Sequence, residues 1–131
     1  MSFKLLEPGD YRATLKSVER TGFKNGSGKK LVLKFVTEVE GKEMSVWHDL
    51  PVKHNSSKYL EFGRKGADML LKALGVEEGL EGVDNDINVL EDYEGEELII
   101  GVGIDEGREY VKDGKTLMGK DRNAVKAFKA A

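Results

Sequence analysis

Basic and aromatic side chains are interspersed along several stretches of the 131-residue chain, and this mixture of residue types can bind single-stranded nucleic acid. Such binding needs cations that follow the phosphates and flat rings that stack on the bases, at roughly 1–3 kcal/mol for each stacked base. The candidate phosphate contacts are Lys16, Arg20, Lys24, Lys29, Lys30, Lys34, Lys112, Lys115, Lys120, Arg122 and Lys126. The candidate stacking residues are Phe23, Trp47 and Tyr110.

The explanation that competes with nucleic-acid binding places the aromatic rings in the core and the basic residues on the outer surface, where they are simply solvated. Phe35 and Tyr11 share strand faces with leucines, so we expect both in the core. Phe23 lies among glycines and lysines without apolar neighbours, and an exposed ring of this kind favours an interaction site. Trp47 lies opposite the face of its valine and methionine neighbours, and the pattern favours core and surface equally.

The net charge of −3 conceals a separation of charge along the chain. Residues 1–66 hold 13 Lys and Arg against 8 Asp and Glu, and residues 108–131 hold 7 against 3. Residues 67–107 hold one lysine against 13 acidic residues. Such a separation indicates a basic working face, and we expect the acidic segment to lie away from the path of the bound strand.

No arrangement of residues in the sequence indicates catalysis. The absence of cysteine excludes disulfides, thiolate metal sites and cysteine nucleophiles. The run Gly26-Ser27-Gly28-Lys29-Lys30 lacks the first glycine and the Ser or Thr of a phosphate-binding loop. His48, Asp49 and His54 are the candidate ligands for a small metal-dependent nuclease, but two histidines are too few for a typical site. We therefore expect a protein that is not an enzyme and holds neither a metal nor another cofactor.

The elements that must position the basic and aromatic residues are mainly strands. Period-two alternation predicts five strands, over residues 9–18, 30–39, 43–49, 97–104 and 121–128. Leucines at helical spacing predict one helix over residues 57–74, and Leu50-Pro51 is expected to end the sheet before it. Residues 105–119 are predicted to form a loop or a small hairpin, and residues 76–92 a covering loop with at most one helical turn.

The order β-β-β-α-β-β is typical of the OB fold. We therefore predict a mainly β protein with a five-stranded OB-like barrel and one helix between strands three and four. An SH3-like barrel normally lacks the helix, and a split β-sheet sandwich is the remaining alternative. The length fits a single OB-like domain over residues 1–131, with an acidic covering segment at about 76–97.

Composition also indicates where the protein works. The longest apolar run, residues 98–104, is far shorter than the roughly 20 residues of a membrane helix. Charged residues interrupt the N-terminal region where a secretory signal would have its apolar core. Together with the lack of cysteine, this predicts a cytoplasmic protein without a membrane partner.

Five stretches resemble a family of small bacteriophage proteins: PGDYRATL (8–15), SGKKLVLKF (27–35), GADMLLKALG (66–75), YEGEEL (93–98) and DRNAVKAF (121–128). That family has long been catalogued as a domain of unknown function, and it is associated with the single-stranded DNA-binding proteins of phage replication and recombination. The resemblance implies an OB-like barrel and sequence-tolerant binding of single-stranded DNA in the host cytoplasm. Many phage proteins of this kind carry an acidic C-terminal tail for recruiting partners, whereas this chain ends with Lys129-Ala130-Ala131.

The expected function is therefore sequence-tolerant binding of single-stranded DNA in phage replication or recombination, by phosphate tracking and base stacking. The alternative is an OB-like protein-interaction module whose acidic segment docks a replication or recombination protein. Oligonucleotide binding without cleavage separates the first function from the second and from a nuclease. The sequence leaves the number of chains in the assembly open, a dimer included.

Overall fold

The computed structural model describes residues 5–22, 28–54, 56–84, 86–107 and 109–131. The elements are β1 (Gly9–Gly22), β2 (Gly28–Val39), β3 (Lys42–His54), α1 (Ser57–Ala73), η1 (Gly79–Val83), η2 (Ile87–Tyr93), β4 (Glu97–Asp105), β5 (Glu109–Lys112), β6 (Lys115–Met118) and β7 (Arg122–Lys129), where η denotes a 3-10 helix. The predicted mainly β class is confirmed, as is the position of the helix between the third and fourth long strands. Among the helices of the described ranges, none has the length and apolar character to cross a membrane.

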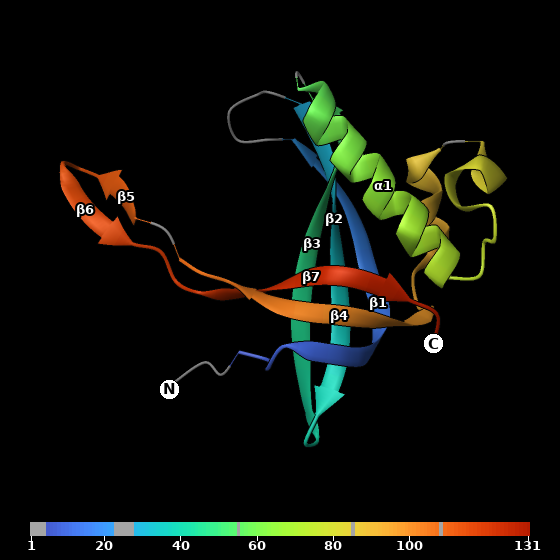
Figure 1. The fold of residues 1–131 in the computed structure, drawn as a ribbon, viewed down its shortest axis with the longest axis horizontal. Helices are drawn as coiled ribbons and strands as arrows, with labels where there is room; N and C mark the ends of the chain where they lie inside the picture. The colour runs from blue at the N-terminus through green and yellow to red at the C-terminus, as the bar shows by residue number, and fades with distance from the viewer. Residues whose placement is uncertain (1–4, 23–27, 55, 85, 108) are drawn as a thin grey trace.

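Five strands form one antiparallel sheet in the order β3-β2-β1-β4-β7. Strand β1 belongs to both halves of this sheet, because residues 9–14 pair with β4 and residues 14–22 pair with β2. Figure 1 shows β1 bending between the two halves, so that β4 and β7 cross β2 and β3 steeply. No ladder joins β3 to β7 within the described ranges, so the sheet is open and is not a closed barrel.

One core lies between the curved sheet and α1. Period-two alternation in β2 turns Leu31, Leu33 and Phe35 inward, and all three side chains are buried. The apolar face of α1 adds Leu70 and Leu71, which are also buried. The prediction that Phe35 belongs to the core is therefore confirmed. The same alternation leaves the other side chains of β2 on the outer face of the sheet, where they can meet a ligand.

Helix α1 approaches β3 so closely that Gly63 has no room for a side chain. A Cβ atom at Gly63 would lie 2.5 Å from the carbonyl oxygen of Pro51. The prediction that Leu50-Pro51 ends the sheet is wrong, because β3 continues to His54 with Pro51 buried opposite Lys30. The ladder shifts register next to Lys30, and such an irregularity accommodates a proline that has no N–H to donate.

The acidic segment, residues 76–97, forms η1 and η2 in place of the predicted covering loop with at most one helical turn. The Asp68 carboxylate on α1 accepts a hydrogen bond from the Leu80 N–H at 2.9 Å, which holds η1 against the helix. This hydrogen bond, assisted by Lys72, lowers the pKa of Asp68. Residues 109–118 form the hairpin β5–β6, which projects beyond the sheet at the left of Figure 1.

Candidate nucleic-acid interface

Lys34 and Trp47 lie side by side on the outer face of the sheet. They are directly opposite each other in the β2–β3 ladder, and Lys34 Nζ lies 5.8 Å from the centroid of the Trp47 ring. Trp47 is 56% exposed, whereas its neighbour Val46 is buried. The structure thus settles the open position of Trp47 in favour of the surface. A cation beside an exposed ring offers a phosphate contact and a stacking surface next to each other.

Lys16 lies on the adjoining strand. The β1–β2 ladder runs from Leu15 opposite Phe35 to Ser17 opposite Lys34, so Lys16 is the extra residue of a register shift. Its side chain is exposed, and the next residue, Ser17, lies opposite Lys34 in the ladder. We call Lys16, Lys34 and Trp47 the Trp47 platform. The bulge matters because it adds a cation to a strand whose regular alternation would supply fewer outward positions.

A second basic cluster lies where the β1–β2 and β2–β3 ladders reach their loop end. Its cations line an open pocket of about 470 Å³ together with Asn88 of η2, and they are Arg20, Lys29, Lys30 and Lys53. We call these four cations the basic pocket. Lys53 was not predicted from the sequence, since the third strand was expected to end before it. The cross-strand pairing of Lys29 with Lys53 places it here.

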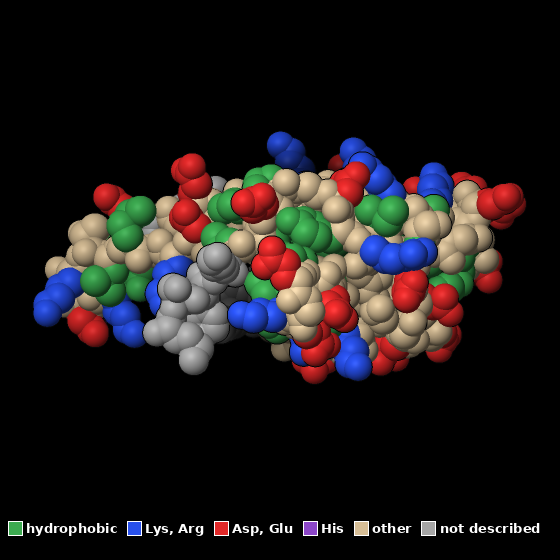
Figure 2. Space-filling model, turned by 90° about the horizontal axis from the view of Figure 1, so that it is seen from below, with side chains coloured by type: hydrophobic (Ala, Val, Ile, Leu, Met, Phe, Trp, Pro, Cys, Tyr) green, Lys and Arg blue, Asp and Glu red, His purple; other side chains and the backbone are tan. Residues whose placement is uncertain are grey.

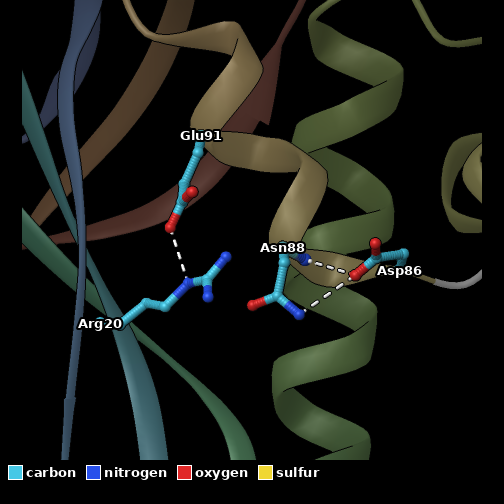
Figure 3. A network of polar contacts seen from close by, with 4 residues as sticks. All are labelled: Arg20, Asp86, Asn88 and Glu91. Atoms are coloured by element: carbon cyan, nitrogen blue, oxygen red, sulfur yellow. Dashed lines mark hydrogen bonds and ion pairs between the residues drawn. The ribbon is translucent and has the colours of Figure 1, made fainter.

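Two cations of the basic pocket are already paired with carboxylates. Arg20 Nε lies 2.7 Å from Glu91 of η2, and Lys30 Nζ lies 2.7 Å from Asp49. Figure 3 shows Arg20 extending from β1 to η2, where Glu91 meets it beside Asn88. The acidic segment was expected to lie away from the path of a bound strand, yet here one of its carboxylates contacts Arg20, a predicted phosphate contact. The reason is tertiary packing, because η2 lies against β1.

Asn88 is held in place by its own local contacts. Asp86 caps η2 and accepts hydrogen bonds from the Asn88 backbone N–H at 3.0 Å and from the Asn88 side-chain amide at 3.1 Å (Figure 3). This arrangement fixes a polar side chain at the rim of the basic pocket. The sequence signal for it is an Asp two residues before an Asn at the start of a helical turn.

The hairpin β5–β6 carries a third group of predicted residues. Tyr110 lies opposite Leu117, and Lys112 lies opposite Lys115, so the tyrosine and both lysines share one face. All eight residues of the two strands are exposed. At the base of the hairpin lies an open groove of about 930 Å³, and Tyr110 is one of the residues that line it. Lys120 and Arg122, also predicted as phosphate contacts, line this groove together with Asp105, Glu106, Glu109 and Asp121.

Lys126 lies apart from these groups, on β7. Its Nζ is paired with Asp105, and its aliphatic stem lies along Gly103, where a Cβ atom would meet it at 3.0 Å. Phe23 and Lys24 lie outside the described residues. The predicted contacts thus divide into the Trp47 platform and the basic pocket on β1–β3, the hairpin group, and Lys126 in the other half of the sheet.

The face of the molecule drawn in Figure 2 does not carry one continuous patch of basic side chains. On the face drawn in Figure 2, basic and acidic side chains are interspersed around apolar patches, and basic side chains also stand on the hairpin at the left. Tyr11, predicted in the core, is half-buried against it, and its hydroxyl donates to the Glu7 carbonyl at 2.6 Å.

Two of the three candidate metal ligands, His48 and Asp49, do not converge, and the side chain of the third, His54, lies outside the described part of the structure. His48 and Asp49 are consecutive on β3 and point to opposite faces, where His48 meets the Phe128 ring at 5.4 Å and Asp49 meets Lys30. Burial lowers the pKa of His48 below its ordinary value of 6.5, and Lys126 adds to this effect while Asp49 opposes it. Within the described ranges, no three His, Asp or Glu residues gather in a way that would hold a metal ion.

Comparison with known proteins places the chain in a family without a described function. No curated protein matches the sequence. The family model described as "Protein of unknown function (DUF669)" matches residues 1–130. Because the match covers almost every residue, from the platform strands to the β7 edge, the chain belongs to the DUF669 family.

Proposed function

We propose that this protein binds single-stranded DNA along the outer face of β1–β3, without strong sequence preference. The observation that carries the proposal is the Trp47 platform, in which a ring that is 56% exposed stands beside Lys34. A tryptophan in the core of a protein buries a large apolar area. The exposed position of the Trp47 ring therefore needs an explanation other than core packing. Stacking on bases supplies that explanation, and it tolerates any base sequence because every base has a flat face.

The basic pocket extends this surface toward the loop that joins β1 to β2. Arg20, Lys29 and Lys53 are exposed cations on three neighbouring strands, so they can contact phosphates of a strand whose bases lie on Trp47. The hairpin face with Tyr110, Lys112 and Lys115 offers a second set of the same residue types. A bound strand that reaches both sets would cover the outer face of the sheet.

The topology supports an OB-like fold for this proposal. The strand order β3-β2-β1-β4-β7, with α1 between β3 and β4, is the order expected for an OB barrel that is open between its edge strands. Across that opening, Phe128 of β7 lies 5.4 Å from the His48 ring and 5.7 Å from the Phe35 ring. OB folds bind oligonucleotides on the face of strands two and three and on the loops after strands one and four. These places correspond to the Trp47 platform, the basic pocket and the β5–β6 hairpin.

Trp47 is the only tryptophan of the chain, so its fluorescence reports on the platform alone. We expect an oligodeoxythymidylate of about 16 nucleotides to quench this fluorescence on binding. In an anisotropy assay with a labelled oligonucleotide, Trp47→Ala should weaken binding about 5- to 150-fold, the equivalent of one stacked base. Phe62→Ala, which removes an exposed ring from α1, is the matched control and should change the affinity less than twofold.

Three results would contradict the proposal. They are the absence of oligonucleotide binding, unchanged affinity in Trp47→Ala, and magnesium-dependent cleavage of the oligonucleotide. Duplex DNA and RNA of the same length, measured in the same buffer, show which nucleic acid is preferred. The melting temperature of Trp47→Ala must stay close to that of the wild type, because the ring is largely outside the core.

A further inference from the structure

The outward side of α1 carries a stripe of exposed basic and apolar residues. The five are Lys58, Phe62, Lys65, Met69 and Lys72. They follow one another at steps of four, three, four and three residues, so they share one helical face. The opposite face, with Gly63, Ala67 and Leu70, is buried against the rest of the protein. We call the five residues the α1 stripe.

The apolar members of the α1 stripe are unusually open to solvent. Phe62 is 57% exposed and Met69 is 46% exposed, and they lie seven residues apart. At a rise of roughly 1.5 Å per residue, their separation along the helix is about 10 Å. Phenylalanine forms helices less readily than alanine, lysine or glutamate, so helix formation does not explain its presence at an exposed position. Exposed apolar residues close together on a rigid element mark an interaction surface.

The lysines of the α1 stripe argue against a second copy of the chain as the partner. In a heptad, Phe62 and Met69 occupy one core position while Lys58, Lys65 and Lys72 occupy the other. Two such stripes packed on each other would bring lysines together or bury them against apolar rings without partners. A helix with acidic residues at the facing positions would pair with each lysine and still cover both apolar side chains.

The α1 stripe also fits nucleic acid less well than the Trp47 platform does. Met69 has no flat ring on which a base could stack. Lys72 Nζ lies 3.1 Å from the Asp68 carboxylate, so Lys58 and Lys65 carry the charge complementarity toward a partner. We propose that the α1 stripe binds an acidic amphipathic helix of a partner protein. The apolar residues of that helix pack on Phe62 and Met69, and its carboxylates pair with the lysines. This inference does not depend on the binding of DNA.

The test uses the full chain and a labelled synthetic peptide of about 21 residues, or three heptads, with leucine at one core position and glutamate at the other. Fluorescence anisotropy should detect binding to the wild-type protein. Phe62→Ala combined with Met69→Ala should weaken this binding about tenfold or more. Lys58→Glu combined with Lys65→Glu should also weaken it, and a peptide with lysine in place of the core glutamates should regain affinity for that variant.

Arg64→Glu is the matched control, because it reverses an exposed charge of α1 outside the α1 stripe. It should change peptide affinity less than twofold, and all variants should melt close to the wild type. The proposal is wrong when the wild type does not bind the acidic peptide or when the stripe variants bind it equally well. Loss of oligonucleotide binding in the stripe variants would assign the α1 stripe to nucleic acid and would also overturn the proposal.

Discussion

Arg20 forms an ion pair within the fold and is also one of the proposed phosphate contacts. Its guanidinium is paired with Glu91 at 2.7 Å, and the two side chains are 61% and 37% exposed. An ion pair this open to water contributes at most about 1 kcal/mol, so a phosphate can displace the carboxylate. Under the proposed function, Glu91 competes with phosphate for Arg20 and lowers the affinity of the basic pocket for a strand without blocking it.

Replacing Glu91 tests this competition. Glu91→Gln should raise oligonucleotide affinity about two- to fivefold, because the carboxylate no longer competes for Arg20. Glu77→Gln removes a charge elsewhere in the acidic segment and should have a smaller effect. The two mutations Arg20→Gln and Glu91→Gln should be non-additive in a double-mutant cycle. An equal gain from Glu91→Gln with and without Arg20 would show a general charge effect and no competition.

His48 makes the stability of the fold depend on pH. Burial lowers its pKa in the folded protein below the ordinary 6.5, so the unfolded chain binds a proton at a higher pH than the folded one. The free energy of unfolding should therefore be highest above pH 6.5, the ordinary pKa of histidine, and should decrease as the pH falls below that value. Urea denaturation between about pH 7.5 and pH 5.5 should show this loss in the wild type and a smaller loss in His48→Gln. His54→Gln is the control. The assignment to His48 would be refuted if the dependence of the unfolding free energy on pH disappeared in His54→Gln and persisted in His48→Gln.

At the scale of the elements, the contact between α1 and β3 decides how the helix closes the core. Gly63 lets α1 lie directly on the Pro51 carbonyl, and the neighbouring Gly66 lies near the end of the Leu50 side chain. The two glycines differ in what a methyl group would meet. At Gly63 it would meet backbone at 2.5 Å, whereas at Gly66 it would meet a side-chain methyl at 3.0 Å.

A pair of alanine substitutions in α1 tests this contact. Gly to Ala in a helix ordinarily stabilises a protein by roughly 1 kcal/mol. Gly63→Ala should instead lower the free energy of unfolding by about 1–3 kcal/mol, because the helix must move off β3. Gly66→Ala should be close to neutral, since the end of the Leu50 side chain can shift. Chemical denaturation measures both, and a stabilised Gly63→Ala would contradict the close contact.

At the scale of the whole molecule, the separation of charge along the sequence is partly cancelled in three dimensions. Three ion pairs each join a base of residues 1–66 or 108–131 to an acid of residues 67–107, namely Arg12–Glu97, Arg20–Glu91 and Lys126–Asp105. The cations of the Trp47 platform and basic pocket that have exposed side chains are Lys16, Arg20, Lys29 and Lys53. Under the proposed function, these cations and the half-buried Lys34 limit the number of phosphates that a strand can contact on this face.

The dependence of binding affinity on salt concentration should report how many phosphates the protein neutralises. For about four to six neutralised phosphates, the logarithm of affinity should fall with the logarithm of salt at a slope of about −0.7 for each. Lys29→Gln should make the slope shallower by about 0.7. Lys72→Gln, on α1, should leave the slope unchanged. Affinity that does not respond to salt would exclude phosphate tracking as the mechanism.

Much of the fold could be predicted from the sequence, because period-two and helical spacing are local properties. The alternation of Leu31, Leu33 and Phe35 defined β2, and the leucine spacing defined α1 to within one residue of its end. The extent of β3 could not be predicted, because a proline ends most strands. Here β3 continues past Pro51, next to a register shift in the β2–β3 ladder. Lys53 was missed for that reason.

By itself, the sequence determined the five long strands, the helix α1, their order and the residue types that a nucleic-acid surface needs. Only the tertiary structure decided which of those residues meet. It placed Trp47 outside and beside Lys34, brought Glu91 onto Arg20, and left the sheet open between β3 and β7. The physical reason is that side-chain periodicity reports a residue's own strand or helix, whereas a contact between elements depends on how the whole core packs. That packing bends β1 and presses η2 against it, and neither event leaves a pattern in the sequence.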